Sequence, residues 1–436
     1  MIRTEELTGF VGLSHLGIIS STCWASKCSP IIGFDIDEER INKLRFNKAP
    51  VDEPKLNDLL HDTSGRRSYS TDFSDLSKCR TVFITQDIKT DSDNSSDYIS
   101  FYDLLDRVIP NLADNTVIVL MSQVSVGTCR ALIDRIRAQR PDLSFDLVYM
   151  VETLIFGKAV ERFLKPERII LGTALGEDGF MEKYRSFGNA LNSFDVPVLT
   201  MKYESAELTK LAINLYLFNS ITYANTLADL CEAYSADMNQ IIPALRMDKR
   251  IGMYSYIQPS LGITGGNLER DMATLSKLEK AKGIKPGLVD LLIRLNDDRY
   301  KWLEKQLDRY LFSKISRPRI AIWGLAYKKD TDSTKNSISL KIINELSHKA
   351  DFSAFDPIVR TIRDVNIVSF CNDRYNALND AHCLIVLTDP DEFHELDIRE
   401  LKSRMRRSLI IDCVNLYPSL HKGKDREDIE YVAIGR

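Results

Sequence analysis

The segment Leu7–Gly12, LTGFVG, decides the fold of the first part of the chain. Gly9 and Gly12 match the last two glycines of the pattern G-x-G-x-x-G. That pattern makes a tight turn between a strand and a helix whose N-terminus faces a pyrophosphate group. In this interpretation Leu7 takes the place of the first glycine, and the helix begins near Leu13. The residues predicted to contact a dinucleotide are Gly9, Phe10, Val11 and Gly12.

The sequence on either side of this turn gives two further indications. Ile31–Asp35 is an apolar run that ends on an acid, 23 residues after Gly12. An acid at about this distance suits a hydrogen bond to a ribose 2′-hydroxyl and favours NAD over NADP, whose 2′-phosphate it repels. The preceding strand would be Arg3–Glu6, which is polar, whereas a buried parallel strand is nearly all apolar. We therefore predict NAD as cofactor, with Asp35 on the ribose and an altered turn.

Apolar runs with strand character alternate with helical patterns in two parts of the chain. Such alternation is typical of βαβ units and buried parallel sheets. The runs are Pro30–Phe34, Thr81–Thr85, Thr116–Met121, Leu147–Val151, Arg168–Gly172, Arg319–Gly324, Phe352–Phe355, Cys383–Thr388 and Leu409–Cys413.

Between these two parts, from Glu204 to about Ser235, apolar residues recur at helical spacing without proline or glycine. The predicted fold class is α/β, with two Rossmann-like doubly wound domains joined by a long central helix and a helical dimerisation region. The expected domains are residues 1–203, 204–305 and 316–436. The charged tail after Tyr417 is expected to be a solvated end.

The composition of the chain limits the classes of partner and of site that we expect. A net charge of −4, with 44% hydrophobic and 28% charged residues, is ordinary for a globular protein and gives no general attraction to nucleic acid or lipid. The sequence has no signal peptide pattern and no apolar run of about 18 to 20 residues. Its eight cysteines are scattered and its six histidines have no metal-ligand spacing. We expect a cytoplasmic protein with reduced thiols and without a metal site.

Six motifs carry a resemblance to one family. They are GFVGL (9–13), DEP (52–54), AELTKLAINLYLFN (206–219), DKRIG (248–252), SLGITGGNLERD (260–271) and GLAYKKDTD (324–332). Together they resemble the UDP-glucose/GDP-mannose dehydrogenase family over residues 9 to 415. That family oxidises the C6 alcohol of a nucleotide sugar to an aldehyde and then to a carboxylate, using two NAD. The resemblance implies a nucleotide-sugar substrate, with a UDP-sugar preferred, a homodimer, and a place in surface-polysaccharide or sugar-nucleotide metabolism.

The residues that this resemblance assigns to the first oxidation are present. They are Lys210 and Asn214, which lie four residues apart and so share one helical face, and Asp271. Glu152 matches an acid that holds the hydrolytic water of the second oxidation.

Most other groups for the second oxidation are missing. Asn267 stands where the family has its nucleophilic cysteine, and a carboxamide cannot form the covalent thiohemiacetal. Phe156 replaces a second acid and Gln123 replaces a threonine. A separate departure lies at the cofactor site, where Ile88-Lys89 stands in place of the Thr-Pro of the family.

The resemblance also assigns a substrate site. The matching residues are Gly262, Gly265, Tyr327, Lys328, Lys335, which stands for an arginine, and Arg250, which in the family reaches a neighbouring subunit. Val414 replaces an arginine that binds the nucleotide, which removes a bidentate phosphate contact.

Three functions follow as alternatives. The first is an NAD-dependent nucleotide-sugar oxidoreductase limited to one two-electron step or to redox-neutral chemistry. The second is a non-catalytic relative that binds a nucleotide sugar or acts as a scaffold. The third is the full four-electron oxidation to a uronate through a gem-diol, without covalent catalysis.

Overall fold

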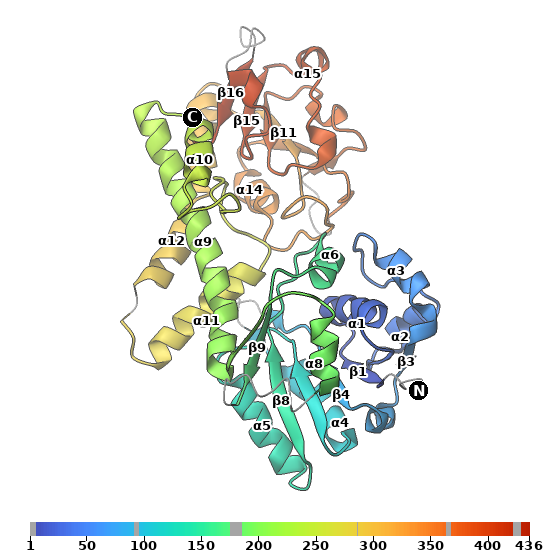
Figure 1. Cartoon of the computed structure of the whole chain (residues 1–436). Coiled ribbons are helices and arrows are strands. Elements are labelled where there is room, and N and C mark those ends of the chain that lie inside the picture. The colour runs from blue at the N-terminus through green and yellow to red at the C-terminus, as the bar shows by residue number, and fades with distance from the viewer. Residues whose placement is uncertain (1–5, 91–95, 175–184, 286, 363–367, 422–428) are drawn as a thin grey trace. The chain divides into compact units, whose positions relative to one another are not determined.

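The computed structural model describes the whole chain except residues 1–5, 91–95, 175–184, 286, 363–367 and 422–428. It contains two compact units, Met1–Ile213 and Asn214–Arg436. Each unit holds one predominantly parallel sheet, as the two sets of apolar runs predict (Figure 1).

The sheet of the first unit has eight strands in the order β10-β9-β8-β7-β4-β1-β2-β3. Neighbouring strands pair in parallel, except that β8 and β9 are antiparallel. The strands are β1 (Thr8–Val11), β2 (Ile31–Phe34), β3 (Arg67–Ser70), β4 (Thr81–Ile84), β7 (Thr116–Leu120), β8 (Phe145–Met150), β9 (Ile169–Thr173) and β10 (Val198–Lys202), with a separate hairpin of β5 (Lys89–Thr90) and β6 (Ser96–Asp97).

Helices cover both faces of this sheet because successive strand residues point to opposite faces. Phe10 packs into one core cluster with residues of α1, α2, α3, α6 and α8, whereas Val11 packs into another with residues of α4 and α5. The helices are α1 (His15–Lys27), α2 (Glu38–Arg45), α3 (Leu56–Asp62), α4 (Ile99–Val108), α5 (Thr128–Gln139), α6 (Ala159–Leu164) and α8 (Arg185–Asn192).

The predicted long helix is α9, Tyr203–Tyr234, with 32 residues. It starts in the first unit and continues into the second, whose other helices near the middle of the chain are α10 (Met238–Met247), α11 (Asn267–Ala281), α12 (Leu288–Asp298) and α13 (Lys301–Leu307).

The second sheet is entirely parallel, with six strands in the order β13-β12-β11-β14-β15-β16. Its strands are β11 (Arg319–Trp323), β12 (Asp351–Phe355), β13 (Val368–Phe370), β14 (Cys383–Val386), β15 (Leu409–Asp412) and β16 (Glu430–Ala433), and its helices are α14 (Ile338–Leu346) and α15 (Ile398–Arg404). The predicted fold class is therefore confirmed.

The C-terminal segment differs from the prediction of a solvated end. Residues 430–433 form the edge strand β16, and Ile434 is fully buried. The amide of Gly435 donates to Glu232 Oε1 at 2.8 Å, and its carbonyl accepts from the amide of Met238 at 3.0 Å. The charged stretch that suggested a free tail lies mostly at 422–428, outside the described residues. The apolar residues after it belong to the core.

Candidate functional site

The glycine turn lies five residues later than the sequence prediction placed it. Gly9, Phe10 and Val11 are buried residues of β1 and not part of a turn. The chain leaves the sheet at Gly12, and α1 begins at His15. Gly12–Gly17, GLSHLG, is thus the strand–turn–helix segment, and it has the pattern G-x-S-x-x-G. The predicted strand Arg3–Glu6 falls mostly on residues 3–5, which lie outside the described part, and the first described strand is β1.

The two glycines of this turn are required by close approach of the backbone. Gly12 has φ +84°, and a Cβ there would lie 2.8 Å from the amide nitrogen of Gln86. A Cβ on Gly17 would overlap the carbonyl oxygen of Gly12. These are the contacts that the first and third glycines of a dinucleotide turn provide, so the residues present fit a bound dinucleotide. The second position, where the backbone approaches the pyrophosphate, is Ser14.

Asp35 directly follows β2 and is buried. Its carboxylate accepts from the amide of Leu13 at 2.7 Å and from that of Asp37 at 2.9 Å, and it forms an ion pair with Arg40 at 2.9 Å. One contact of this acid is therefore with the turn itself. The predicted hydrogen bond to a ribose remains a prediction.

The second unit repeats this arrangement. Asp356 follows β12, and its carboxylate accepts from the amides of Leu325 at 2.8 Å and Ala326 at 3.1 Å, just after β11. Gly324 there has φ +98°. An acid after the second strand thus holds the turn after the first strand in both sheets.

Glu152 and Lys210 form an ion pair in the first unit. The Lys210 amine donates to Glu152 Oε1 at 2.6 Å and to the Glu152 carbonyl oxygen at 3.1 Å, and Lys210 is only 7% exposed. Glu152 follows β8, and Lys210 lies in the second turn of α9. The structure therefore brings together two residues that the sequence predicted as catalytic.

Another carboxylate of the first unit, that of Glu53, supports the loop that carries Glu152. Glu53 is buried and accepts from the amides of Gly157 at 3.1 Å and Ala159 at 2.7 Å. It also lies 3.1 Å from His15 Nε2. The sequence analysis used Glu53 only as part of the DEP motif. Its place beside a proline before a helix gave no signal that it binds a loop 100 residues away.

Phe156, in place of an acid, belongs to this same loop. Its ring lies over the imidazole of His15, with 4.4 Å between ring centroids. The loop thus presents an aromatic surface to the first turn of α1, where the family resemblance leads one to expect a carboxylate.

In the second unit, Asn214 donates a hydrogen bond from its side-chain nitrogen to Asp271 Oδ2. Arg270 Nε lies 3.3 Å from Asp271 Oδ1. All three residues are buried, with exposed fractions of 8%, 2% and 5% for Asn214, Asp271 and Arg270. Such a network is stabilised only when its charges are paired, which is the case for this acid.

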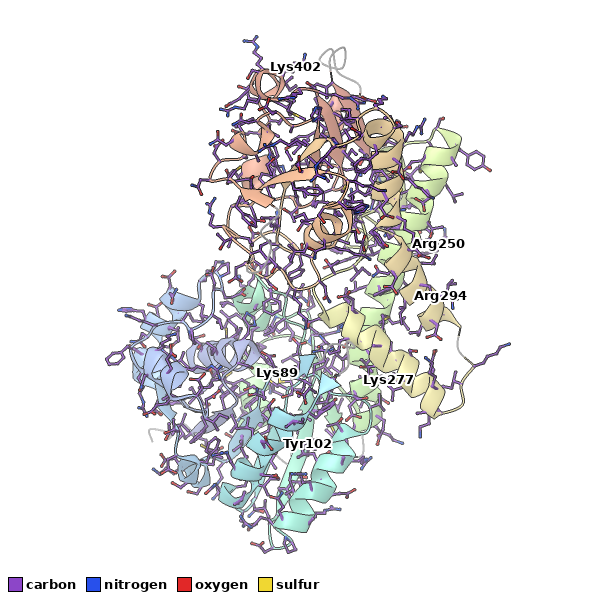
Figure 2. The ribbon with its side chains drawn as sticks, turned by 180° about the vertical axis from the view of Figure 1, so that it is seen from behind. Lys89, Tyr102, Arg250, Lys277, Arg294 and Lys402 are labelled. Atoms are coloured by element: carbon purple, nitrogen blue, oxygen red, sulfur yellow. The ribbon has the colours of Figure 1, made fainter. Side chains whose placement is uncertain are left out.

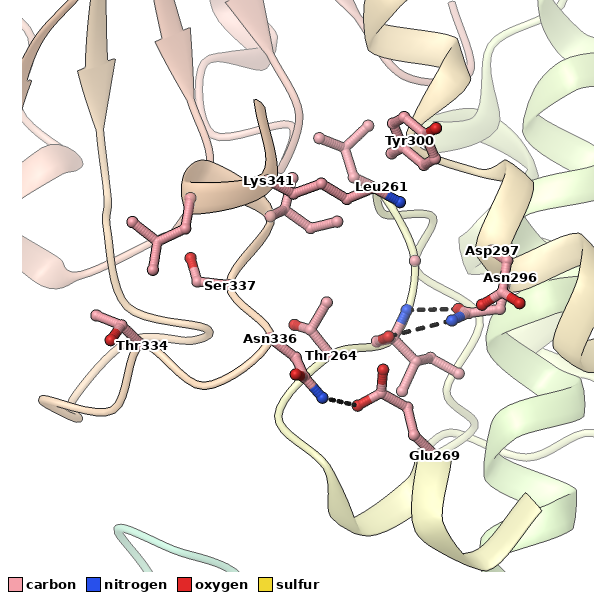
Figure 3. A pocket seen from close by; sticks show the side chains of 14 residues that line it. Leu261, Thr264, Glu269, Asn296, Asp297, Tyr300, Thr334, Asn336, Ser337 and Lys341 are labelled. Atoms are coloured by element: carbon pink, nitrogen blue, oxygen red, sulfur yellow. Dashed lines mark hydrogen bonds between the residues drawn. The ribbon is translucent and has the colours of Figure 1, made fainter. Parts of the chain in front are cut away.

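Asn267 is the first residue of α11 and is exposed. The loop before it depends on glycines, because Gly262, Gly265 and Gly266 have φ values of +108°, +102° and +101°. Glu269 closes this turn by accepting from the Gly266 amide at 2.9 Å and from the Asn336 side chain at 3.2 Å (Figure 3).

Two cavities of the second unit border this loop. One, of about 320 Å³, lies between the loop, the end of α12 and the segment before α14 (Figure 3). The other, of about 200 Å³, is lined among others by Tyr327, Lys328, Cys413 and Val414. The second cavity brings together the residues predicted to bind a nucleotide. The partly buried apolar Val414 side chain offers no charge there, as the sequence indicated.

The remaining predicted substrate residues lie in different places. The Lys335 amine lies 3.7 Å from the position that a Cβ on Gly266 would take, so it borders the Asn267 loop. Arg250 is at the surface of the second unit (Figure 2), and its guanidinium pairs with Asp248 at 2.6 Å. The described residues contain no group of three or more potential metal ligands. No helix among them is long and apolar enough to cross a membrane.

Three family models cover most of the chain. They are the NAD binding domain (residues 7–184), the central domain (204–298) and the UDP binding domain (321–419) of the UDP-glucose/GDP-mannose dehydrogenase family. The sequence is 28% identical over 440 residues to UDP-glucose 6-dehydrogenase of Rhizobium meliloti, covering 98% of both chains. It is 27% identical to UDP-glucose 6-dehydrogenase TuaD of Bacillus subtilis, covering 93% of this chain and 88% of that protein.

Two solved structures share the fold. A UDP-glucose dehydrogenase from Pyrobaculum islandicum has a TM-score of 0.85 at 23% identity, covering 99% of this chain and 98% of that one. A UDP-D-ManNAc dehydrogenase from Pyrococcus horikoshii has a TM-score of 0.83 at 20% identity, covering 99% of both.

Proposed function

Because the chain belongs to the UDP-glucose/GDP-mannose dehydrogenase family of NAD-dependent nucleotide-sugar oxidoreductases, we propose that it oxidises the primary alcohol of a nucleotide sugar only to the aldehyde. The observation that carries this proposal is the contrast between two sets of residues. The pairs Lys210–Glu152 and Asn214–Asp271 are formed, with Lys210, Asn214 and Asp271 buried, whereas the position of the nucleophile holds Asn267.

In the first oxidation, the hydroxyl group loses its proton while the carbon that bears this group loses a hydride. NAD, when bound, supplies the acceptor of that hydride. In the first unit, the Lys210 ammonium, oriented by Glu152, is the group that we assign to stabilise the developing alkoxide, and the family resemblance assigns the proton transfer to the carboxylate of Asp271 in the second unit. Asn214 holds that carboxylate through its side-chain amide. The products of the step are an aldehyde, one reduced cofactor and one proton.

The second oxidation in this family needs a thiolate, and none is in place in this chain. All eight cysteines lie in the described residues and are free. Cys413 lines the cavity beside Lys328, but it is fully buried and burial raises the pKa of its thiol well above the ordinary value. A thiol in that state is a poor nucleophile. We therefore assign the chain one two-electron step.

A second candidate function is a non-catalytic relative that binds a nucleotide sugar. Val414 at the nucleotide cavity and Phe156 on His15 favour it, because both replace charged groups of the family. Either function leaves the substrate a nucleotide sugar, for which the named relatives make a UDP-sugar the first choice.

The deciding experiment incubates purified protein with NAD and a panel of UDP- and GDP-sugars. It follows absorbance of NADH and identifies the sugar product by mass spectrometry. One NADH per sugar, with an aldehyde or a trapped hydrate, is the expected result. Two NADH with a uronate would contradict the one-step proposal. Binding of the nucleotide sugar without any turnover would favour the binding relative.

We also propose that the active form is a homodimer joined through α9. Tyr216, Tyr223 and Leu230 recur every seven residues on this helix and are 59%, 48% and 51% exposed. Residues at that spacing form one stripe, which a second copy can cover. Sedimentation velocity should give a dimer for the wild type and a monomer for Tyr223→Glu with Leu230→Glu. Ile358→Glu, a comparably exposed position elsewhere, should remain a dimer.

Two further assignments remain proposals. The three-part division at 1–203, 204–305 and 316–436 is supported by the extents of the three family models. A cytoplasmic location is supported by the eight free cysteines, because disulfides form and persist in oxidising compartments.

A further inference from the structure

The first turn of α1 already carries a carboxylate of the chain itself. The amide of Leu16, the second residue of the helix, donates a long hydrogen bond of 3.4 Å to Asp87 Oδ2. Leu16 lies in the turn Gly12–Gly17, at the helix end whose free amides attract anions. The side chain of Ser14, just before the helix, makes no capping hydrogen bond to these amides. The anion that meets this helix end is thus Asp87.

The fold places Asp87 there and holds it. β4 pairs in parallel with β1, in the register Val11 with Ile84, so the segments that follow both strands leave the same edge of the sheet. The Thr85 amide donates to the Val11 carbonyl oxygen at 2.8 Å. The Asp87 amide donates to Ser14 Oγ at 3.0 Å.

Ser14 contributes to this arrangement through the position it occupies. It stands at the second glycine of the turn pattern, and its hydroxyl, besides accepting from Asp87, donates to the carbonyl oxygen of Thr85 at 3.1 Å. A glycine at this position would have no such side chain. The serine therefore ties the segment after β4 to the turn and directs the aspartate to the helix end.

We propose that Asp87 is an internal competitor for the pyrophosphate of the dinucleotide and sets the affinity of the cofactor site. The inference rests on the NAD assignment of the proposed function, but it concerns binding and not turnover. A dinucleotide pyrophosphate at the turn needs the same helix end, and two anions in one place repel each other. Binding therefore requires the Asp87 side chain to leave Leu16.

The neighbouring imidazole of His15 is also engaged by two other groups. His15 Nε2 lies 3.1 Å from Glu53 Oε2, and its ring is covered on one side by Phe156. His15 is thus already in contact with another carboxylate. Replacement of Asp87 by a neutral side chain is expected to remove the competition.

The test measures binding by calorimetry with the full-length wild type, Asp87→Asn and Asp87→Ser. The ligands are NAD, ADP-ribose, which keeps the pyrophosphate, and adenosine, which lacks it. Both variants should bind NAD and ADP-ribose about tenfold more tightly than the wild type, with adenosine affinity unchanged. Asp142→Asn is the matched control, because it removes the same charge from an exposed loop before β8. This loop lies at the opposite end of the parallel strands from Asp87.

Equal or weaker binding of ADP-ribose by both folded Asp87 variants would overturn the inference, including the case in which no protein binds it. A gain that appears equally in Asp142→Asn would also overturn it, because the effect would then be one of net charge. Melting curves of each variant establish that it is folded. Failure of the proposed function is seen separately, as absence of sugar oxidation, and does not change this comparison of affinities.

Discussion

Substitution of Gly17 by alanine tests where the dinucleotide turn lies. A Cβ at this position would overlap the Gly12 carbonyl oxygen and lie 2.7 Å from Thr85 Oγ1. Because Gly17 is inside α1, alanine also brings a helix-propensity gain of about 1 kcal/mol. Overpacking against backbone costs about 3 kcal/mol, the upper end of the usual range, since a peptide group cannot rotate away. The expected net loss of stability is about 2 kcal/mol.

For a unit of 213 residues, this loss should lower Tm by roughly 4 to 8 °C. The measurement is thermal unfolding by circular dichroism, together with NAD binding by calorimetry, which should also weaken. Gly9→Ala is the control, because its Cβ would meet the flexible end of Leu76 at 3.2 Å and Cys79 Sγ at 3.3 Å. We expect its Tm to fall by less than about 3 °C. A rise in Tm for Gly17→Ala would mean that the propensity gain is unopposed and that the turn is not at Gly12–Gly17.

Three other substitutions test the site and the C-terminal edge. Lys210→Ala leaves the Glu152 carboxylate without its cation, so we expect at least 100-fold slower sugar oxidation and a loss of about 3 kcal/mol on urea unfolding. Activity at wild-type level would contradict the role of Lys210. Asn267→Cys should give measurable uronate by mass spectrometry if the thiol is the one missing group; if only aldehyde appears, Phe156 limits the second step as well. Burial raises the pKa of Glu232, so the folded protein holds that proton more tightly than the unfolded chain, and this group's contribution to stability falls as pH rises above about 4.3. Glu232→Gln should flatten that part of the Tm-against-pH curve, and an unchanged slope would assign it to other groups.

The parts of the fold that were predictable from sequence are those with a dense local signal. Buried parallel strands such as β4 and β14 read as continuous apolar runs, and α9 keeps helical spacing over 32 residues. β3 was missed because three of the four residues in its sequence, RSYS, are polar and because it is the edge strand of its sheet. β16 was missed because a charged stretch precedes it. In both cases the strand depends on a neighbour far along the chain.

The turn was misplaced for a different reason. Gly9 and Gly12 have the spacing of the last two glycines of the pattern by coincidence. In the true turn, Gly12–Gly17, Ser14 occupies the position of the second glycine, so the pattern is incomplete there. One signal was available. Gly17 precedes Asp35 by 18 residues, close to the roughly 20 that separate the turn from its acid, while Gly12 precedes it by 23. With the turn at Gly12–Gly17, the strand before it is β1, which pairs with β2 in the register Val11 with Phe34. This strand is apolar, as a parallel sheet requires.

The candidate catalytic residues were predictable from the resemblance, but their partners were not. Lys210 and Glu152 are 58 residues apart in sequence, and no local pattern indicates that their side chains meet. Glu53 and Asp87 act through backbone amides of distant segments, so nothing in their own neighbourhoods marks them. Long-range hydrogen bonds of this kind depend on the strand order, which the sequence does not display.

The energetic cost of the retained groups supports the one-step function over a purely binding role. A largely buried ion pair such as Lys210–Glu152 rarely stabilises a fold more than apolar residues of similar volume would. The Asn214–Asp271 network has the same cost, since its members are removed from water and must be paired. A chain that only bound a ligand could replace these groups without losing stability. Asn267, in contrast, is exposed at the start of a helix, where exchange of a thiol for a carboxamide costs the fold little. Three of these four groups, Lys210, Asn214 and Asp271, are those that the family resemblance assigns to the alcohol oxidation, which is where we place the remaining activity.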